Sequence, residues 1–291
     1  MTPRQPDPLY HLRLLFLMGR VSNLPTVWSN CLAAWLLSGG GDTARLQLVC
    51  LGATFLYLGG MYLNDAFDAA FDAQFRRERP IPAGLIRLGT VWQLGVLWLG
   101  LGLLTLAWLG KATGVLAVLL IVTVVVYDAV HKAITLAPVL MALCRFLLYL
   151  IAGTSASNGL SGLTVWSGVA LALYILGLSY IARHESTRPS LRWWPTGFLA
   201  APVVLALVVN GEGYYQQAGW LILLLVFWII QCLHSRAGET SPDLKRTVSG
   251  LLAGIIWVDL LAVAGGTTTI AMLFVALFLL ARLLQRVIPA T

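Results

Sequence analysis

Long apolar runs recur along the whole chain, separated by short polar connections. A helix needs about 20 apolar residues to cross the roughly 30 Å hydrocarbon core of a bilayer, and most of these runs are close to that length. The pattern therefore predicts nine or ten membrane-spanning helices. Gly265 and Gly266, between the last two runs, form either a tight turn between two helices or a kink within one. The predicted runs are Leu14–Leu37, Ala44–Ala70, Leu88–Leu109, Thr113–Ala129, Ala137–Ser157, Leu163–Ile181, Pro195–Val209, Ala218–Leu233, Val248–Ala264 and Thr268–Val287.

Polar residues are too scarce to cover a water-soluble fold. Of the 291 residues, 59% are hydrophobic and 11% are charged, whereas soluble domains carry about 25% charged residues; the mean hydropathy is +0.84. No segment alternates apolar and polar residues as barrel strands do, and unpaired backbone groups are not tolerated in lipid. We therefore predict an all-α fold, a polytopic transmembrane helical bundle that forms a single domain over residues 1–291.

The basic residues indicate how the bundle is oriented. With ten spans and a cytoplasmic N-terminus, nearly all Lys and Arg side chains fall on the inner side. Because positive loops stay cytoplasmic, we expect a protein of the cytoplasmic (inner) membrane with its basic loops facing the cytoplasm. The net charge of +7 then reflects topology and contact with the inner leaflet. Nucleic-acid binding is not expected, since the basic residues are dispersed among short loops. The inner loops carry Arg79, Lys132, Arg188 and Lys245.

An acidic segment follows directly on the second apolar run. Asn64, Asp68 and Asp72 stack at every fourth position of a helix, and Asp65 lies beside that row. Carboxylates at membrane depth are costly and indicate a functional site. Several oxygen ligands on one helix face suit Mg²⁺ that bridges to a substrate phosphate. The alternative is a solvated acidic helix end, paired with the arginines just downstream.

A proline-stiffened loop with three arginines comes next, R-R-E-R-P-I-P-A-G over residues 76–84. Guanidinium groups form paired hydrogen bonds with phosphate oxygens, so this loop can supply diphosphate contacts beside the acidic row. Taken alone, it is more typical of an ordinary positive-inside loop. The joint pattern, N-D-x-x-D-x-x-x-D followed by R-x-x-R-P-I-P-x-G, favours a diphosphate site.

With these two motifs the sequence resembles the UbiA superfamily of intramembrane prenyltransferases. The segment Arg20-Val21-Ser22-Asn23, residues 127–132, the span count and the chain length add to the resemblance. Members bind an isoprenoid diphosphate through Mg²⁺, ionise it and transfer the prenyl group to an aromatic or lipid acceptor. The resemblance implies that Asn64, Asp65, Asp68 and Asp72 are metal ligands, that Arg77, Arg79 and Lys132 contact the diphosphate, and that Asn23 lies at the substrate.

One part of the family pattern is missing. Members carry a second Asp-rich motif at the inner end of the sixth helix, which supports a second Mg²⁺, but the corresponding stretch here is S-Y-I-A-R-H-E-S over residues 179–186. Arg183 and His184 would repel a second metal, whereas Arg183 can hold diphosphate directly through charge-assisted hydrogen bonds. We therefore expect Arg183 and Glu185 at the substrate. This stretch, together with C-R-F-L-L-Y-L over residues 144–150, looks like the EboC-like members.

Two isolated charges and one tyrosine complete the candidate set. Arg145 lies inside the fifth run, where an unpaired cation is costly; it either binds substrate or forms a structural ion pair with Asp128. Asp259, in the ninth run, is interpreted as structural, either protonated or hydrogen-bonded. Tyr57 shares a helix face with Asn64, so its ring can lie over the metal face and stabilise an allylic cation. Packing alone also accounts for that spacing.

We therefore expect a Mg²⁺-dependent prenyltransferase with Asp68, Asp72, Arg183 and Tyr57 as its catalytic residues and its active site on the cytoplasmic side. The donor is an isoprenoid diphosphate, and the acceptor is an aromatic or lipid molecule. The alternative, which the missing second motif favours, is a non-catalytic protein that binds or transports isoprenoid diphosphates or lipid precursors on the same scaffold. An ion-coupled transporter is less favoured, because the acids cluster at one end of the spans.

Overall fold

All regular secondary structure in the described residues is helical. The computed structural model describes residues 8–184, 194–209, 214–234 and 244–290. The elements are α1 (Pro8–Met18), the short 3-10 helix η1 (Val21–Asn23), α2 (Leu24–Leu37), α3 (Thr43–Phe75), α4 (Leu88–Leu109), α5 (Lys111–Val130), α6 (Ala137–Ser155), α7 (Gly162–His184), α8 (Trp194–Phe198), α9 (Ala201–Val208), α10 (Tyr214–His234), α11 (Leu244–Ala262) and α12 (Thr268–Val287). The predicted all-α class is confirmed.

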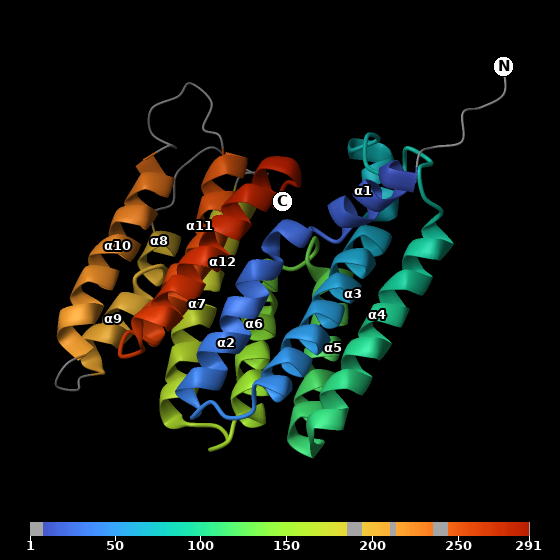
Figure 1. Cartoon of the computed structure of the whole chain (residues 1–291). Coiled ribbons are helices and arrows are strands. Elements are labelled where there is room, and N and C mark those ends of the chain that lie inside the picture. The colour runs from blue at the N-terminus through green and yellow to red at the C-terminus, as the bar shows by residue number, and fades with distance from the viewer. Residues whose placement is uncertain (1–7, 185–193, 210–213, 235–243, 291) are drawn as a thin grey trace.

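The long helices run side by side, and α1 and the end of α12 lie at the same end of the bundle (Figure 1). Among the described residues, six helices are long and apolar enough to cross a membrane, namely α3, α4, α5, α6, α7 and α12. Large apolar side chains point outward from them, including Trp108 and Trp166, which are 86% and 62% exposed. An exposed apolar surface of this kind is stable in lipid and not in water. The protein is thus an integral membrane protein, while the count of nine or ten spans stays a prediction.

The first predicted run, Leu14–Leu37, is not one continuous helix. It divides between α1 and α2, because Arg20 takes a left-handed backbone conformation with φ of 41° and the 3-10 turn of η1 follows it. A left-handed residue cannot continue a right-handed helix. The break directs Arg20 toward α3, which matters for the site described below.

The seventh run, Pro195–Val209, is also divided. Pro202 lies in the first turn of α9, so α8 and α9 form two short helices in place of one; a proline has no N–H with which to bond the preceding turn. The final two runs are separate helices, since a turn occupies the stretch between α11 and α12. In that turn the Gly266 amide donates to the Val263 carbonyl at 2.8 Å. The turn interpretation of the glycine pair is therefore confirmed.

Small residues bring α3 and α4 into close contact. A Cβ atom added to Gly102 would lie 2.9 Å from the Gly52 carbonyl oxygen, and one added to Gly59 would lie 2.9 Å from the Leu99 backbone nitrogen. Close backbone approach of this kind is a common basis of helix association in membranes. Because α3 is continuous from Thr43 to Phe75, the contact also fixes the acid-bearing end of that helix.

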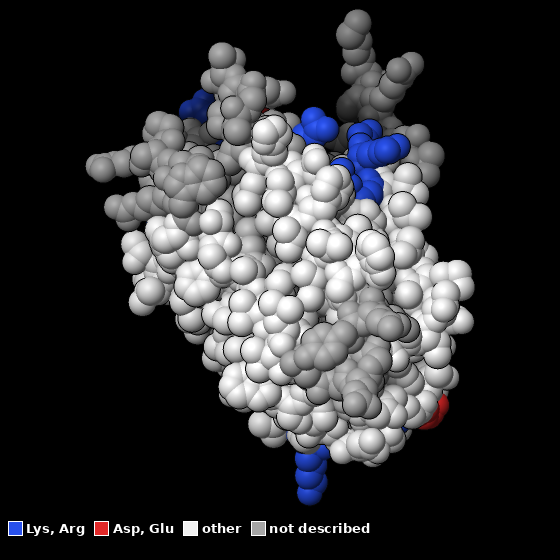
Figure 2. All heavy atoms as spheres, turned by 90° about the vertical axis from the view of Figure 1, so that its left-hand side faces the viewer, with Lys and Arg blue, Asp and Glu red and all other residues white. Residues whose placement is uncertain are grey.

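Basic side chains gather at one end of the bundle. Figure 2 shows most of them at the end where α1 and the end of α12 lie, above a broad belt without charge on the face shown, while a basic side chain also projects from the opposite end. An uncharged belt is what a bilayer requires of the surface that it surrounds. The one-sided distribution of positive charge predicted from the sequence is therefore present in three dimensions.

Candidate active site

A cavity of about 920 Å³ lies toward the charged end, among α1, α3, α5, α6, α7 and α11. This volume is within the range of about 300–1,000 Å³ typical of small-molecule sites. One part of its wall is polar and comes largely from α3, while the rest is apolar and comes from Leu14, Leu17, Met18, Met141, Ile175, Leu178, Val248 and Leu252. The predicted residues that line it are Asn23, Tyr57, Asn64, Asp65, Asp68, Arg79, Arg145 and Arg183.

The acidic row lies on a buried face of α3. Asn64, Asp65 and Asp68 line the cavity and are 7%, 6% and 6% exposed. Asp72 is 2% exposed and lies one turn further along, outside the cavity lining. The row is thus not a solvated helix end, because its side chains are shielded from water.

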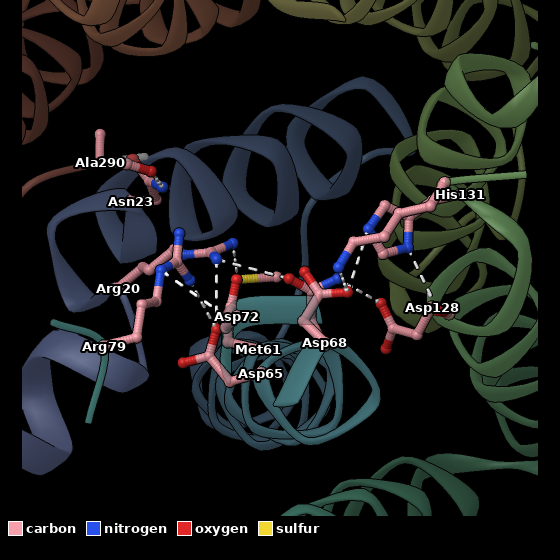
Figure 3. A network of polar contacts seen from close by, with 12 residues as sticks. Arg20, Asn23, Met61, Asp65, Asp68, Asp72, Arg79, Asp128, His131 and Ala290 are labelled. Atoms are coloured by element: carbon pink, nitrogen blue, oxygen red, sulfur yellow. Dashed lines mark hydrogen bonds and ion pairs between the residues drawn. The ribbon is translucent and has the colours of Figure 1, made fainter. Parts of the chain in front are cut away.

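Arginines neutralise the Asp65 end of the row (Figure 3). Asp65 Oδ1 accepts a hydrogen bond from Arg79 at 3.1 Å and lies 3.5 Å from Arg20, while Arg79 Nε is 3.9 Å from Asp72 Oδ2. Arg79 therefore reaches back from the loop to two carboxylates, as the proposed pairing of the acids with downstream arginines requires. Positive and negative charges alternate at this edge of the cavity.

Arg20 is a site residue that sequence reasoning noted only as part of the family resemblance. Its guanidinium donates to Met61 Sδ and to Asn64 Oδ1, both at 3.4 Å. Its left-handed backbone costs roughly 1–2 kcal/mol, and the Tyr57 hydroxyl holds that conformation by donating to the Arg20 carbonyl oxygen at 3.2 Å. Backbone strain of this kind is concentrated at functional sites, and here it turns a cation onto the acidic row.

The end of α5 supplies the cations at the Asp68 end. Lys132 Nζ lies 2.6 Å from Asp68 Oδ1, and His131 Nε2 lies 3.5 Å from the same oxygen. Lys132 also lies over the ring of Phe71, 3.9 Å from its centroid. Burial lowers the pKa of His131, but the hydrogen bond to Asp68 and the charge of that carboxylate together raise it by more. The pKa of His131 therefore lies above its ordinary value. Lys132, which was predicted to contact diphosphate, is thus paired with Asp68 in this structure and does not itself line the cavity.

The oxygen donors of α3 fit Mg²⁺ chemically, although they are not gathered around one point. Carboxylate and amide oxygens are its preferred protein ligands. Asp72 Oδ1 and Asp128 Oδ2 are buried and have no hydrogen-bond partner among the described residues. Among the residues that the structure describes, however, no three His, Cys, Asp or Glu side chains are close enough together to hold a metal ion. In this structure the carboxylates are instead held in ion pairs, Asp65 and Asp72 with Arg79 and Asp68 with Lys132.

Arg145 does not pair with Asp128, so that predicted ion pair is wrong. Its guanidinium donates to Asn30 Oδ1 at 2.7 Å and to Thr26 Oγ1 at 3.2 Å. Asn30 Nδ2 in turn donates to Asp259 at 2.7 Å. Arg145 and Asp259 thus form an ion pair bridged by an amide, which joins α6, α2 and α11 below the cavity.

Asp259 has the structural, hydrogen-bonded environment expected from the sequence. It is completely buried and accepts hydrogen bonds from Ser29 Oγ at 2.6 Å and from Tyr149 Oη at 3.3 Å, in addition to the Asn30 amide. A buried charge needs such partners. Arg145 lines the cavity while this network holds it from behind.

The remaining predicted residues differ in their positions. Asn23 lines the cavity, and its Nδ2 donates to the Ala290 carbonyl at 3.0 Å. Arg183 also lines the cavity and donates to the Ile134 carbonyl oxygen. Arg77, in the turn after α3, is exposed, donates to the Ala73 carbonyl oxygen of that helix and does not line the cavity. Glu185 lies outside the described residues.

Asp128 is a further residue that the sequence did not identify as part of the site. It is 4% exposed, and its Oδ1 accepts a hydrogen bond from Asn64 Nδ2 at 2.9 Å. The signal that was available is the spacing of Asp128, His131 and Lys132 at the end of α5, which places three polar side chains on one side of a helix end.

Residues 22–289 match the sequence model of the UbiA prenyltransferase family. The chain belongs to this family. A curated relative, a digeranylgeranylglyceryl phosphate synthase from Metallosphaera sedula, is 24% identical over 249 residues, which are 80% of this chain and 87% of the relative. Membership and this relative make the protein a prenyltransferase; the EboC-like branch stays a prediction.

Solved structures of UbiA-type proteins share the fold. A digeranylgeranylglyceryl phosphate synthase in membranes has a TM-score of 0.61 at 20% identity, covering 88% of this chain and 98% of the other. A UbiA homologue from Archaeoglobus fulgidus bound to GPP and Mg²⁺ has a TM-score of 0.50 at 15% identity, covering 94% and 97%. The predicted UbiA-like bundle is therefore confirmed.

Proposed function

We propose that the protein transfers a prenyl group from an isoprenoid diphosphate to an aromatic or lipid acceptor within the membrane, with Mg²⁺ bound at the acidic row of α3. The observation that carries this proposal is the cavity itself. It brings a row of oxygen ligands, several guanidinium groups and an apolar wall into one space, and these are the three surfaces that a prenyl diphosphate requires. The relative that makes a prenylated glyceryl phosphate and the neighbour solved with GPP and Mg²⁺ support the same chemistry.

The ion pairs on α3 define what ligand binding has to change. Mg²⁺ would be held by Asn64, Asp65, Asp68 and Asp72, and it supplies positive charge to the diphosphate. Arg79 and Lys132 then exchange carboxylate partners for diphosphate oxygens, which keeps every charge paired. In the absence of ligand, the same cations keep the carboxylates from repelling one another.

The chain's own residues account for the transfer as follows. The bond between C1 of the prenyl group and the diphosphate oxygen breaks, and the diphosphate leaves with the electron pair while Arg20, Arg79 and Lys132 donate hydrogen bonds to it. The apolar wall from α6, α7 and α11 holds the prenyl chain away from water. The ring of Tyr57 faces the allylic cation. The acceptor's nucleophilic atom then bonds to C1, and its proton passes to solvent at the charged end.

Arg183 takes a direct role in this proposal. It lines the cavity from the C-terminal end of α7. A guanidinium can bind diphosphate without a metal, so the site works with one acidic row. A cationic α7 wall also favours the second candidate function, a protein that retains isoprenoid diphosphate but transfers nothing.

The side of the membrane follows from charge. The cavity opens toward the end that carries most of the basic side chains, and positive segments stay in the cytoplasm. We infer that the active site faces the cytoplasmic side of the inner membrane.

Transfer can be tested with the purified protein in lipid nanodiscs. Labelled geranyl and geranylgeranyl diphosphate are offered with Mg²⁺ or with EDTA, together with either an aromatic acid or a glycerol phosphate lipid as acceptor. A labelled, prenylated product that requires Mg²⁺ is the expected result. Retention of the diphosphate without any product would instead identify the non-catalytic binding protein.

A further inference from the structure

The structure points to a specific role for Asp128, which no part of the proposed reaction uses. Asp128 lies in the last turn of α5, is 4% exposed and does not line the cavity, whereas its neighbours Tyr127 and His131 do. Its carboxylate is turned to a neighbouring side chain and not to the cavity. The effect of this carboxylate on the reaction would therefore pass through the side chain of the residue that it bonds.

That residue is Asn64, the first member of the acidic row. A carboxylate oxygen only accepts hydrogen bonds, so the side of the Asn64 amide that faces Asp128 must be its NH₂ group. The 2.9 Å contact between Asn64 Nδ2 and Asp128 Oδ1 has that polarity. As a consequence, the amide oxygen of Asn64 is directed toward Arg20, whose guanidinium donates to it at 3.4 Å.

The two ends of the Asn64 amide are nearly identical in shape, so packing alone does not choose between them. Only the oxygen end can bind a cation, and the reversed amide would present two hydrogens to a metal. Asn64 is 7% exposed, and Asp128 is the described residue that accepts from its NH₂ group. The orientation of this predicted ligand is therefore set by a carboxylate from a different helix, at 2.9 Å, together with the longer contact from Arg20, at 3.4 Å.

Stability does not explain why a carboxylate is present at this position. Asp128 Oδ2 is buried and has no hydrogen-bond partner among the described residues. Buried polar atoms without partners are costly, and each one requires an explanation. Orientation of a ligand at the adjacent metal face is such an explanation, because carboxylates that orient ligands commonly lie behind metal sites.

We propose that Asp128 is a positioning residue, which fixes the Asn64 amide with its oxygen toward the cavity and so sets the affinity for Mg²⁺ and diphosphate. This proposal rests on the proposed function, because it assumes that Asn64 is a metal ligand. It adds a contribution from α5 to a site whose predicted ligands all lie on α3. His131 and Lys132 extend that contribution, since they bind Asp68 from the same helix end.

The test is a double-mutant cycle between Asp128 and Asn64, measured as binding with no acceptor present. Mn²⁺ affinity is measured by electron paramagnetic resonance, and the affinity for geranyl diphosphate with Mg²⁺ by calorimetry. Asp128→Ser removes the acceptor, because a serine hydroxyl is too short to reach Asn64, and Asn64→Ala removes the amide. Each variant is expected to lose about 10–100-fold in affinity, the range found for residues behind a metal site. The double variant should be no weaker than Asn64→Ala alone, since both changes remove the same interaction.

A conservative variant separates positioning from a purely structural role. Asp128→Asn keeps an oxygen that accepts from Asn64, and its NH₂ group replaces the oxygen that has no partner, so most of the affinity should return. This variant also serves if Asp128→Ser does not fold. Asp42→Asn, at the exposed start of α3, is the matched control for the loss of one negative charge and should bind like the wild type.

The possible failures are distinguishable. If Asn64→Ala weakens binding but Asp128→Ser does not, the positioning role is wrong while the metal face stands. Losses that multiply in the double variant would also overturn it, because the two residues would then act independently. If Asn64→Ala itself binds Mn²⁺ and diphosphate normally, the proposed metal face is wrong, and this proposal is wrong with it.

Discussion

Asp259 holds a buried polar network together, and replacing it should destabilise the fold by a measurable amount. Asp259→Leu removes the acceptor for hydrogen bonds from Ser29, Asn30 and Tyr149. Polar contacts inside membrane proteins average about 0.6 kcal/mol each, whereas loss of one partner of a buried charge pair costs about 3–5 kcal/mol. We expect a loss of about 2–5 kcal/mol, because three bonds disappear and the charge of Arg145 loses its counterion.

The free energy of unfolding can be measured by SDS-driven unfolding in mixed micelles. Asp42→Asn is the control, because Asp42 caps α3 at its exposed start by accepting from the Ala44 amide, and asparagine caps a helix about as well. The control should therefore remain within experimental error of the wild type. A loss of similar size in both variants would show that the buried Asp259 network contributes no more to the free energy of unfolding than an exposed carboxylate does.

A second variant tests the coupling with Arg145. Asp259→Leu combined with Arg145→Leu should recover part of the lost stability, because no unpaired charge then remains in the bundle. If the double variant loses the sum of the two single losses, Arg145 and Asp259 are not energetically coupled. The description of the network as an ion pair bridged by the Asn30 amide would then be refuted.

Three further predictions concern the site, the packing and the topology. Arg183→Ala should weaken diphosphate binding by roughly tenfold to a hundredfold in calorimetry, the effect of losing one charge-assisted contact, and the remaining binding should still need Mg²⁺; wild-type affinity would exclude Arg183 from the site. Gly102→Ala should lower the free energy of unfolding by about 1–3 kcal/mol, because its Cβ would lie 2.9 Å from the Gly52 carbonyl oxygen. Gly100→Ala is the control and should be neutral, since a Cβ there meets nothing within 4 Å. Equal losses in the two variants would contradict the close contact. Cysteines that replace Lys132 and Lys245 should react with an impermeant reagent from the cytoplasmic side only, and labelling of either from outside would break the span assignment.

The parts of the site that depend on local geometry were predictable from the sequence. Asn64, Asp68 and Asp72 share a face because a helix repeats every 3.6 residues, and the apolar residues before Asn64 indicated burial. The bounds of α4 and α12 coincide with the predicted runs, because in lipid the length of an apolar run limits the length of a helix.

Contacts between helices were harder to predict. Asn30 on α2, which bonds both Arg145 and Asp259, lies over a hundred positions from each of them, and hydrophobic periodicity does not predict such pairs. Asp128 was considered only as a partner for Arg145, whereas it bonds Asn64. Arg20 was noted within the R-V-S-N segment but was given no role in the site, since a left-handed arginine has no signature in a single sequence.

We propose that the acidic row of α3 binds Mg²⁺ and diphosphate, rather than serving only to pair with basic residues. Asp68→Ala tests it most directly, because Asp68 is the middle member of the row and lies 2.6 Å from Lys132. Calorimetry with geranyl diphosphate, with and without Mg²⁺, should show that the folded variant loses at least the roughly 10–100-fold typical of residues around a metal site, and that its remaining binding no longer responds to Mg²⁺. Unchanged, Mg²⁺-dependent affinity in the folded variant would contradict the claim and leave the row as an ion-paired helix end.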